Sequence, residues 1–567
     1  MSFLGAQNSI ALGVQGLIHI DTGTGGGAAS YSLAKSLRFR ASASAYLSRT
    51  PAVAGNRRTF TISYWIKRGT LGTSQYVFAA GSGTTESTWF ATPFDTNGTS
   101  FDAAVASTWT TSLGATTAVF RDPAAWYHFV WAVDTTQAVA SDRSKIYANG
   151  VLQTPLATAV AVTQNTDLAW NNSGVVHYIG ARIDGGPRSF FDGELAEINS
   201  VDGYPTGVTQ ALWASTNIAS SFGASSTYNQ WLPIKYAGTY GTNGFYLPFT
   251  NTASTSTLVA DSSGNANNWT PNNISLTAGS TYDSLTDVPT LTSTTVANYP
   301  VLSPLSTYNG GGTLSNGNLT VSLVDSANNK STMATDTGKW YAEFTCVSAG
   351  GYSGTGLAIT TSGASTLYPP TLLRTDYCNN GQTYSYNASA YVSYGVSWTS
   401  GDVIGVAWDC SAAQVTFYKN GVSQGAISSP TLSLTAGGTP FSFIPSSYNT
   451  AVTSSFSVNY GQQPWKYSIP TGFLPLNTFN IAAGTVTTSG TFTGNASTDG
   501  PMVWLNGTPT AMTINGNAVT FGTHADKLAN GFKVRSSSAS YNASGSNTYV
   551  ATTVGEVFKY EDAQSNP

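Results

Sequence analysis

Histidine is the side chain most often used for acid–base catalysis near neutral pH, and this chain of 567 residues has four: His19, His128, His177 and His524. None of them pairs in sequence with a serine in a nucleophile elbow, and no His-Glu-x-x-His zinc motif occurs. His128 falls inside an apolar run, residues 126–133, that is typical of a central strand. We therefore expect His128 to be a hydrogen-bonded core residue and not a catalytic base.

Two carboxylates, Glu194 and Glu197, lie close together in a segment that reads as a strand. A retaining glycosidase needs two carboxyl groups about 5–5.5 Å apart in one cleft. Side chains alternate between the two faces of a regular strand, so a spacing of three residues points them to opposite faces. The spacing therefore argues against a catalytic pair, and the sequence predicts a protein that is not an enzyme.

Metal and cofactor sites are not predicted either. Cys346, Cys378 and Cys410 show no Cys-x-x-Cys spacing and are expected to be reduced core residues. The loop at 261–267 resembles a calcium loop, with oxygens at Asp261, Ser263, Asn265 and Asn267, but it lacks the closing Glu, so a turn cluster is favoured. The glycine runs at 25–27 and 310–312 lack the Lys-Ser/Thr that follows in a phosphate-binding loop.

Composition indicates an all-β protein of several domains. The length exceeds the roughly 100–200 residues of one domain, and short β-branched and aromatic runs alternate with Gly, Ser, Thr and Asn clusters. Charged residues make up 9 % against about 25 % in ordinary globular proteins. A net charge of −4 without a basic patch argues against nucleic acid, and the lack of a long apolar run argues against membrane insertion. The N-terminus lacks the pattern of a secretory signal, which predicts synthesis in a cytoplasm.

One seven-residue pattern occurs twice and organises the strands. Tyr-x-Asn-Gly-Val-x-Gln stands at 147–153 and again at 418–424, each time after a strand-like run that contains Trp and ends in Asp. Asn-Gly supplies the two positive-φ positions of a type I′ hairpin turn. The repeat predicts two β domains that use an equivalent hairpin.

The first of these domains resembles a laminin G-like (concanavalin A-like) jelly roll across about residues 36–205. This resemblance implies two curved antiparallel sheets packed face to face. It is carried, in order, by Phe60–Lys67, the Trp-Tyr-His run at 126–128, the hairpin 145–152, Tyr178-Ile-Gly180 and 191–198. Some concanavalin A-like proteins are laminarinase-like hydrolases, but their Glu-x-Asp-x-x-Glu pattern is absent because Asp192 stands two residues before Glu194.

The second domain, residues 301–475, resembles a SPRY domain, another sandwich of this class. The resemblance is carried by 338–344, 356–359, 401–409, the second hairpin and 458–465. We expect residues 206–300 to form a connector and residues 476–567 a small C-terminal β module. Residues 1–35, with a glycine-rich stretch at 22–30, are expected to be an attachment segment.

This order of domains resembles tail-fibre and other virion structural proteins of bacteriophages. The resemblance implies a virion location, an N-terminal region that binds other virion proteins, and contact of the sandwiches with host-surface polysaccharide. The open alternatives are a head or neck decoration protein that binds only virion partners, and a glycan-degrading enzyme. Strand 126–133 is apolar on both faces, which predicts burial against other copies in a homo-oligomer, a trimer, unless residues 206–300 cover it.

Glycan binding would use aromatic faces for stacking on sugar rings and amides for their hydroxyl groups. The loop-like candidates are Trp89, Trp109, Trp170, Asn171 and Asn172. For each of them the alternative is a packing or subunit-contact role.

Overall fold

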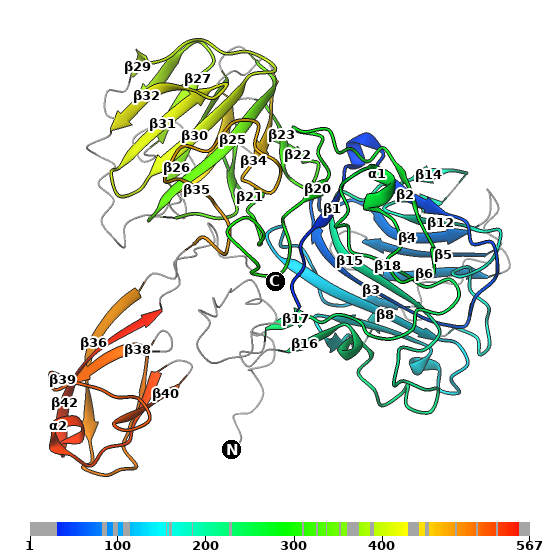
Figure 1. The fold of residues 1–567 in the computed structure, drawn as a ribbon, viewed down its shortest axis with the longest axis horizontal. Helices are drawn as coiled ribbons and strands as arrows, with labels where there is room; N and C mark the ends of the chain where they lie inside the picture. Colours follow the sequence, from blue (N-terminus) through cyan, green and yellow to red (C-terminus); the bar gives the residue numbers. More distant parts are fainter. Residues whose placement is uncertain are drawn as a thin grey trace. The chain divides into compact units, whose positions relative to one another are not determined.

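The computed structural model describes residues 31–554 apart from internal gaps. These gaps are residues 82–87, 95–99, 106–113, 155, 158–161, 184, 226–229, 309–310, 325–326, 336, 351–352, 360–373, 386–389, 429–440, 448–452, 482–484, 506–508 and 529–530. Chain contacts divide the protein into two compact units, and the C-terminal unit is Ile481–Lys559. The predicted all-β class is confirmed, with helices limited to single turns (Figure 1).

The first sandwich consists of two antiparallel sheets that enclose one apolar core. One sheet runs, in spatial order, β10 (Val151–Leu152), β9 (Ser144–Ala148), β8 (Trp126–Asp134), β3 (Thr59–Arg68), β15 (Gly193–Asp202), β1 (Ser36–Phe39) and β20 (Ser284–Leu285), with β18 (Phe245–Leu247) also on β15. The other runs β11 (Leu156–Ala157), β7 (Gly114–Thr116), β6 (Ser100–Val105), β5 (Thr88–Phe94), β4 (Gln75–Gly81), β12 (Val176–Ile179), β2 (Tyr46–Arg49) and β19 (Thr270–Asn272).

Two small hairpins and four single turns of helix complete this sandwich. They are β13 (Arg182–Ile183) with β14 (Pro187–Arg188), β16 (Gly223–Ser225) with β17 (Trp231–Pro233), the helix α1 (Thr255–Leu258) and the 3₁₀ turns at 41–43, 140–142 and 218–221.

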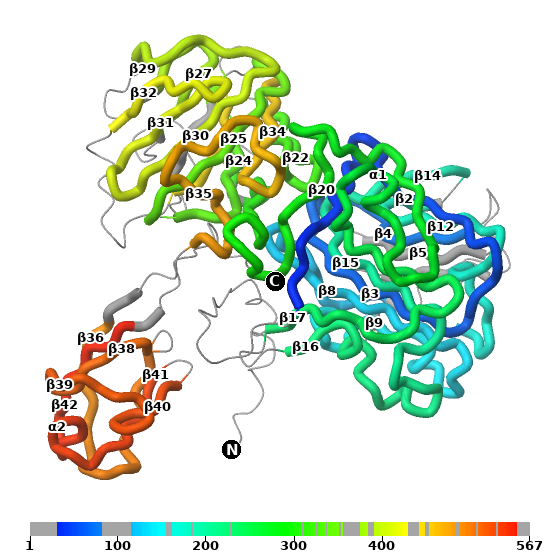
Figure 2. Tube along the Cα trace, viewed as in Figure 1, coloured from blue at the N-terminus to red at the C-terminus, as the bar shows by residue number. Residues whose placement is uncertain are grey.

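Residues 206–300 are part of the first sandwich, so they are more than the expected connector. They add β18, β19 and β20 to its sheets, and Figure 2 shows this green segment running along the blue and cyan strands. They also cover the outer face of β8, where Val130 and Ala132 form one apolar cluster with Trp213 and Phe222. Strand β8, which is apolar on both faces, is therefore covered by its own chain. Burial of this strand does not require an oligomer.

The second sandwich repeats the arrangement with its own pair of sheets. The first is β21 (Leu302–Tyr308), β24 (Asn328–Ser331), β33 (Phe441–Ser447), β26 (Ser353–Ile359), β27 (Arg374–Cys378), β28 (Gln382–Ser385) and β29 (Ala390–Ser393). The second is β22 (Thr313–Ser315), β23 (Thr320–Leu323), β34 (Ser454–Asn459), β25 (Lys339–Ser348), β30 (Val403–Asp409), β31 (Gln414–Lys419) and β32 (Val422–Ser428), with β35 (Leu474–Pro475) parallel to β25.

Both predicted hairpins are present. Asn149 and Gly150 have φ values of 47° and 77° between β9 and β10, and Asn420 and Gly421 have values of 50° and 80° between β31 and β32. Positive φ at both central residues is the signature of a type I′ turn.

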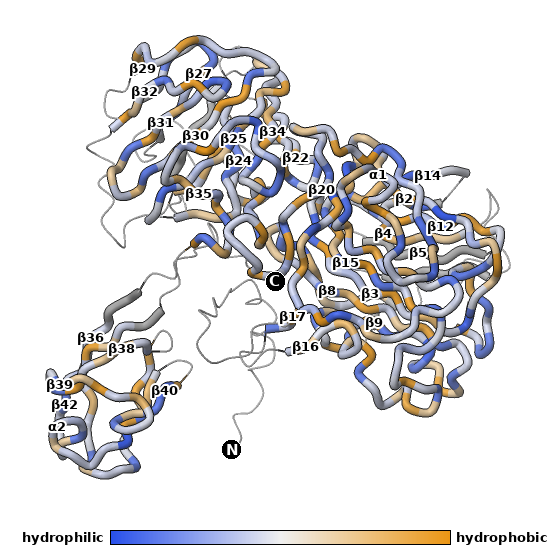
Figure 3. The backbone as a smooth tube through the Cα atoms, in the orientation of Figure 1, coloured by the Kyte–Doolittle hydropathy of each residue, from blue (hydrophilic) through white to orange (hydrophobic). Residues whose placement is uncertain are grey.

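The C-terminal unit has a small core of its own between two sheets. The sheets are β36 (Thr485–Gly494), β42 (Gly545–Val554), β38 (Pro509–Ile514) and β39 (Asn517–Ala518), and β37 (Met502–Trp504), β41 (Gly531–Val534) and β40 (Ala525–Leu528); a helical turn, α2, spans Ala539–Asn542. Figure 3 shows apolar residues recurring along the strands of this unit and of both sandwiches, as period-2 strands with one core face require.

Candidate functional site

The predicted glycan-binding residues do not form an exposed site in the described structure. Trp170 is fully buried, with its ring 4.8 Å from His177 and 6.0 Å from Phe78. Asn171 is buried in a left-handed turn, where its Nδ2 donates to Asp202 Oδ1 at 3.1 Å. Both predictions are wrong, because this loop folds inward and forms core and turn contacts.

Of the other three candidates, Asn172 is described and the two tryptophan side chains are not. The half-buried Asn172 donates its backbone N–H to the Ala169 carbonyl at 3.2 Å and so continues the same turn. Trp89 lies in β5, but its side chain is outside the described residues, as is all of Trp109.

His128 has a serine neighbour, yet its hydrogen bonds prevent it from acting as that serine's base. Its Nε2 lies 2.9 Å from Ser63 Oγ, and its Nδ1 accepts from Trp231 Nε1 at 2.9 Å. Indole N–H can only donate, so Nδ1 must be the acceptor and Nε2 must carry the proton. Burial lowers the pKa of His128 to about 3. The ring is therefore neutral and donates to Ser63, which confirms the prediction of a hydrogen-bonded core histidine.

The sequence Gly421-Val-Ser-Gln-Gly425 satisfies the consensus of a nucleophile elbow. In the structure it forms a hairpin turn and the start of the exposed strand β32, and not the strained strand-to-helix turn that lifts a catalytic serine. Residues 301–475 contain no histidine that could serve as its base.

The prediction for Glu194 and Glu197 is wrong in its premise, because β15 is not a regular strand. A bulge lies between Ala196 and Asn199, and Glu197 has a φ of 44°. This extra residue brings the Glu197 carboxylate beside Asn199, whose Nδ2 donates to it at 3.4 Å, on the outer side that also carries Glu194.

The two carboxyl groups nevertheless have different neighbours. Glu194 accepts from Ser36 Oγ at 3.4 Å, and Glu197 lies among Asn199, Tyr31 and Tyr246. Both are almost fully buried, and burial raises both pKa values, that of Glu197 to about 8. Neither carboxyl faces an open cleft in the described part of the chain.

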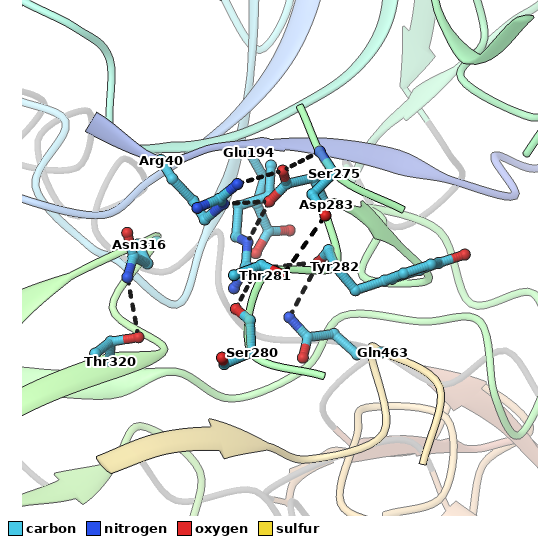
Figure 4. Close-up of polar contacts among 12 residues, drawn as sticks. Arg40, Glu194, Ser275, Ser280, Thr281, Tyr282, Asp283, Asn316, Thr320 and Gln463 are labelled. Atoms are coloured by element: carbon cyan, nitrogen blue, oxygen red, sulfur yellow. Dashed lines mark hydrogen bonds and ion pairs between the residues drawn. The ribbon is translucent and has the colours of Figure 1, made fainter. Parts of the chain in front are cut away.

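The polar groups that the structure does bring together form a junction between the two sandwiches (Figure 4). Asp283 accepts from Arg38 Nε at 3.2 Å and from Arg40 Nε at 2.8 Å. Arg38 Nη2 also donates to the Tyr282 carbonyl at 3.0 Å, and that same carbonyl accepts from Gln463 Nε2 at 3.2 Å. The two arginines thus hold the segment that contacts the second sandwich.

Asp192 is the most heavily used carboxylate of this junction. It precedes β15 and accepts from the backbone N–H groups of Asn316 and Gly317, at 2.8 and 3.1 Å, in the turn between β22 and β23. It also accepts from Thr70 Oγ1 at 2.9 Å. A side chain of the first sandwich therefore satisfies orphan donors in a turn of the second.

Lys67 anchors the segment that leads into the second sandwich, since its partners all lie in residues 287–299. Its Nζ donates to Asp287 Oδ2 at 2.6 Å, Asn298 Oδ1 at 2.8 Å and the Tyr299 carbonyl at 2.6 Å, which uses all three of its N–H groups. Asp287 accepts in addition from Trp126 Nε1 at 2.9 Å. Lys67 and Asp287 are both buried, so each charge depends on the other.

Sequence reasoning did not identify these junction residues. Their position in the sequence could have identified them. Charged residues make up only 9 % of the chain, and Lys67 and Arg38 each lie near the end of an apolar strand. Their partners come from distant segments, which no local pattern reveals.

Hydrogen bonds to Asp261 organise the loop that resembles a calcium loop. Asp261 Oδ1 accepts from Tyr246 N and Ser263 N, each at 2.8 Å, and Oδ2 accepts from Ser263 Oγ and Asn267 N, each at 2.8 Å. The predicted turn cluster is confirmed. Among the described residues, no group of three or more His, Cys, Asp or Glu side chains is placed to hold a metal ion.

The three cysteines are buried, as predicted for core residues. Burial raises the pKa of Cys346 to about 12, so its thiol stays protonated. In the described part of the chain, no helix combines the length and hydropathy needed to cross a lipid bilayer.

Two family models match the sandwiches. Residues 41–206 match the concanavalin A-like lectin/glucanases superfamily through its laminin G model, and residues 372–457 match the SPRY domain. The chain therefore contains a laminin G-like domain and a SPRY domain.

One curated relative is similar over a short stretch. An E3 ubiquitin-protein ligase, RKP, of Arabidopsis thaliana is 37 % identical over 83 residues, which are 15 % of this chain and 6 % of that protein. The chain thus spans a small fraction of the length of this relative.

Solved structures similar to the chain include other sandwiches. The SAP-like pentraxin of Limulus polyphemus is 13 % identical with a TM-score of 0.23, over 33 % of this chain and 82 % of that one. The SPRY domain of human HERC1 is 14 % identical with a TM-score of 0.24, over 28 % and 96 %. Domains LG4-5 of mouse laminin alpha1 are 9 % identical with a TM-score of 0.25, over 76 % and 89 %.

Proposed function

We propose that this protein is a non-catalytic structural subunit of a bacteriophage virion, a tail fibre or similar appendage, that binds host-surface glycans. The supporting observation is that a laminin G-like and a SPRY domain, both of binding type, are joined by buried polar contacts, those of Asp192 above all. A protein with two binding modules binds a surface more tightly when the modules are held at a fixed spacing. No conformational entropy is then lost in ordering the modules when both contact the surface.

Two features of the site favour binding over catalysis. The Ser63–His128 pair is held in the tautomer that cannot accept the serine proton, and Glu194 and Glu197 are closed off from solvent. The low charge also leaves a surface of hydroxyl and amide groups that matches sugar hydroxyls.

A binding and cleavage assay on the purified full-length chain tests this proposal. The chain is incubated with an array of purified bacterial capsular and O-antigen polysaccharides, while bound protein and newly formed reducing ends are measured. Binding without new reducing ends is expected. Cleavage would overturn the non-catalytic assignment, and binding to no polysaccharide would favour the second candidate, a decoration protein that contacts only virion partners.

Location on the particle needs a separate experiment. Gold-labelled antibody against residues 481–559, viewed on intact particles by electron microscopy, is expected to mark the tail appendages. Label on the head would contradict the tail assignment, and particles without label would contradict the virion assignment.

A further inference from the structure

The most exposed large apolar side chain in the described structure is Trp504, at 70 % exposure, and Met502 on the same strand is exposed to 56 %. Both lie on β37, an edge strand of the C-terminal unit. Strand alternation turns Val503, between them, into the core of the unit. The exposure of this pair therefore follows from the strand register, and it places an indole ring in water.

The neighbouring strand leaves the indole uncovered. Trp504 is paired with Gly531 on β41, which has no side chain, and Met502 is paired with Lys533. A side chain at position 531 would place its Cβ 2.0 Å from the Val503 carbonyl oxygen, so the close approach of the two strands requires glycine. The result is an exposed apolar pair, Trp504 and Met502, beside a glycine of the neighbouring strand.

Charged groups border this surface. Lys533 Nζ lies 2.6 Å from Asp499 Oδ1, and the Asp499 side chain is 83 % exposed. On the next strand Asp526 pairs with Lys533 and contacts Arg535 Nη1 at 3.3 Å. These exposed groups can both donate and accept hydrogen bonds next to the ring.

Size decides which kind of ligand fits. At 70 % and 56 % exposure, the two side chains offer on the order of 300 Å² of surface, given about 150–250 Å² for a whole aromatic side chain. A stable protein interface needs roughly 800 Å² on each partner. One exposed ring with polar groups beside it matches instead a single pyranose ring, whose C–H face stacks on indole while its hydroxyl groups reach the charged border.

We propose that Trp504, with Met502 and the Asp499–Lys533 pair beside it, is a glycan-binding platform in the C-terminal unit. This inference rests on the proposed glycan-binding function and names the surface that performs it. Trp504 supplies the stacking face, and Asp499 and Lys533 select the orientation of the sugar through its hydroxyl groups.

The test uses full-length protein and the same polysaccharide array. Trp504→Ala is expected to weaken binding to the recognised polysaccharide by roughly tenfold or more, and Trp504→Phe to weaken it less, because the smaller ring still stacks. Val550→Ala is the matched control, because Val550 is an exposed apolar residue, at 44 %, in the other sheet of the same unit. All variants are expected to stay close to the parent's melting temperature, since Trp504 and Val550 are both exposed and neither belongs to the core of the unit.

Each outcome separates this inference from the proposed function. Loss of binding in Trp504→Ala but not in Val550→Ala supports the platform. If the parent and Trp504→Ala bind equally well, the platform is overturned while glycan binding stands. If the parent binds no polysaccharide, both are overturned, and a protein ligand would be indicated if Trp504→Ala then lost binding to the phage particle.

Discussion

The two Asn-Gly hairpins have the same internal geometry. In the first, the Asn149 backbone N–H donates to the His128 carbonyl at 2.8 Å, and Asn149 Oδ1 accepts the His128 N–H at 2.8 Å. In the second, Asn420 makes the same two bonds with Val403, at 2.8 and 2.9 Å. Seven similar residues therefore fold alike in two domains whose remaining sequences differ.

What covers each hairpin is different. A Cβ on Gly150 would lie 2.3 Å from the Trp231 ring, and one on Gly421 would lie 2.8 Å from the Tyr467 ring. Trp231 is held by its hydrogen bond to His128. Tyr467 is held through its backbone N–H, which donates to Glu343 Oε1 at 2.9 Å.

The Asn-Gly residues therefore determine the conformation of each turn. The ring that covers the turn comes from a distant segment and differs between the two hairpins, so the stability of each turn should differ. A buried histidine also lies under only the first hairpin, because the residue equivalent to His128 is Val403, while Asn420 Nδ2 of the second hairpin donates to the Asp402 carboxylate at 2.7 Å. The two sandwiches should therefore respond differently to substitution and to pH.

The largest effect is expected from removing the cation that anchors residues 287–299 to the first sandwich. Lys67→Met leaves Asp287 buried without its cation, which should cost about 3–5 kcal/mol of unfolding free energy. We expect scanning calorimetry to show the first sandwich melting at a lower temperature in this variant. Lys339→Met is the control, because its ion pair with Asp409 is partly exposed and should be worth less than about 1 kcal/mol.

If Lys67→Met melts like Lys339→Met, the Lys67–Asp287 ion pair does not hold residues 287–299 in place.

The next largest effect is expected at the glycines of the two turns, where a larger side chain would meet the ring of Trp231 or Tyr467. Gly150→Val should cost about 4 kcal/mol and Gly421→Val about 3 kcal/mol, because both place a β-branched residue at positive φ and both meet an aromatic ring, the first one more closely. Chemical denaturation of each purified variant gives these values. Gly174→Val and Gly401→Val isolate the backbone strain, since both positions have positive φ and no atom within 4 Å of the added Cβ.

If Gly150→Val and Gly174→Val lower the free energy of unfolding equally, the Trp231 ring moves aside at little cost. Equal losses at Gly421 and Gly401 would show the same for Tyr467.

Patterns in the sequence predicted two β domains, both hairpins and the buried state of His128, because each of these shows in residues that are neighbours in the chain. The sandwich architecture was implied by the resemblance to laminin G-like and SPRY domains, since its strands pair across long separations. The bulge at Glu197 was not predicted, since a non-glycine residue at positive φ leaves no mark in strand alternation. The inward fold of Trp170 and the covering role of residues 206–300 were missed for another reason. Both depend on long-range packing, which decides whether an aromatic residue in a loop faces water or the core.

A smaller effect should follow pH at His128. Its pKa is lowered to about 3 in the folded state by burial, against about 6.5 in the unfolded chain, so the unfolded state takes up the proton first as pH falls. The stability that the neutral ring contributes is therefore complete above pH 6.5 and decreases as pH falls toward 3, by about 3 kcal/mol at pH 4.

His128→Val makes the first hairpin like the second and removes this titration. The variant should be less stable than the parent at pH 7 by about 1–3 kcal/mol, because Ser63 and Trp231 lose their partner. Urea denaturation between pH 7 and pH 4 should show the parent losing this advantage. His177 and the buried carboxyl groups are common to both proteins and cancel in the difference, so a gap that does not change with pH would contradict a neutral buried His128.

The smallest effect should come from the asparagines of the two turns. Asn149→Ala and Asn420→Ala should each cost about 2 kcal/mol, because alanine tolerates positive φ less well than asparagine and cannot accept the N–H across the hairpin. The loss at Asn420 also includes the bond that its Nδ2 donates to Asp402 Oδ1 at 2.7 Å. Asn149→Gly and Asn420→Gly restore the tolerance of positive φ, so each should cost about 1 kcal/mol less than the alanine variant at the same position. Denaturation midpoints of the four variants measure these costs, and equal losses for alanine and glycine at one position would mean that positive φ costs alanine nothing in that turn.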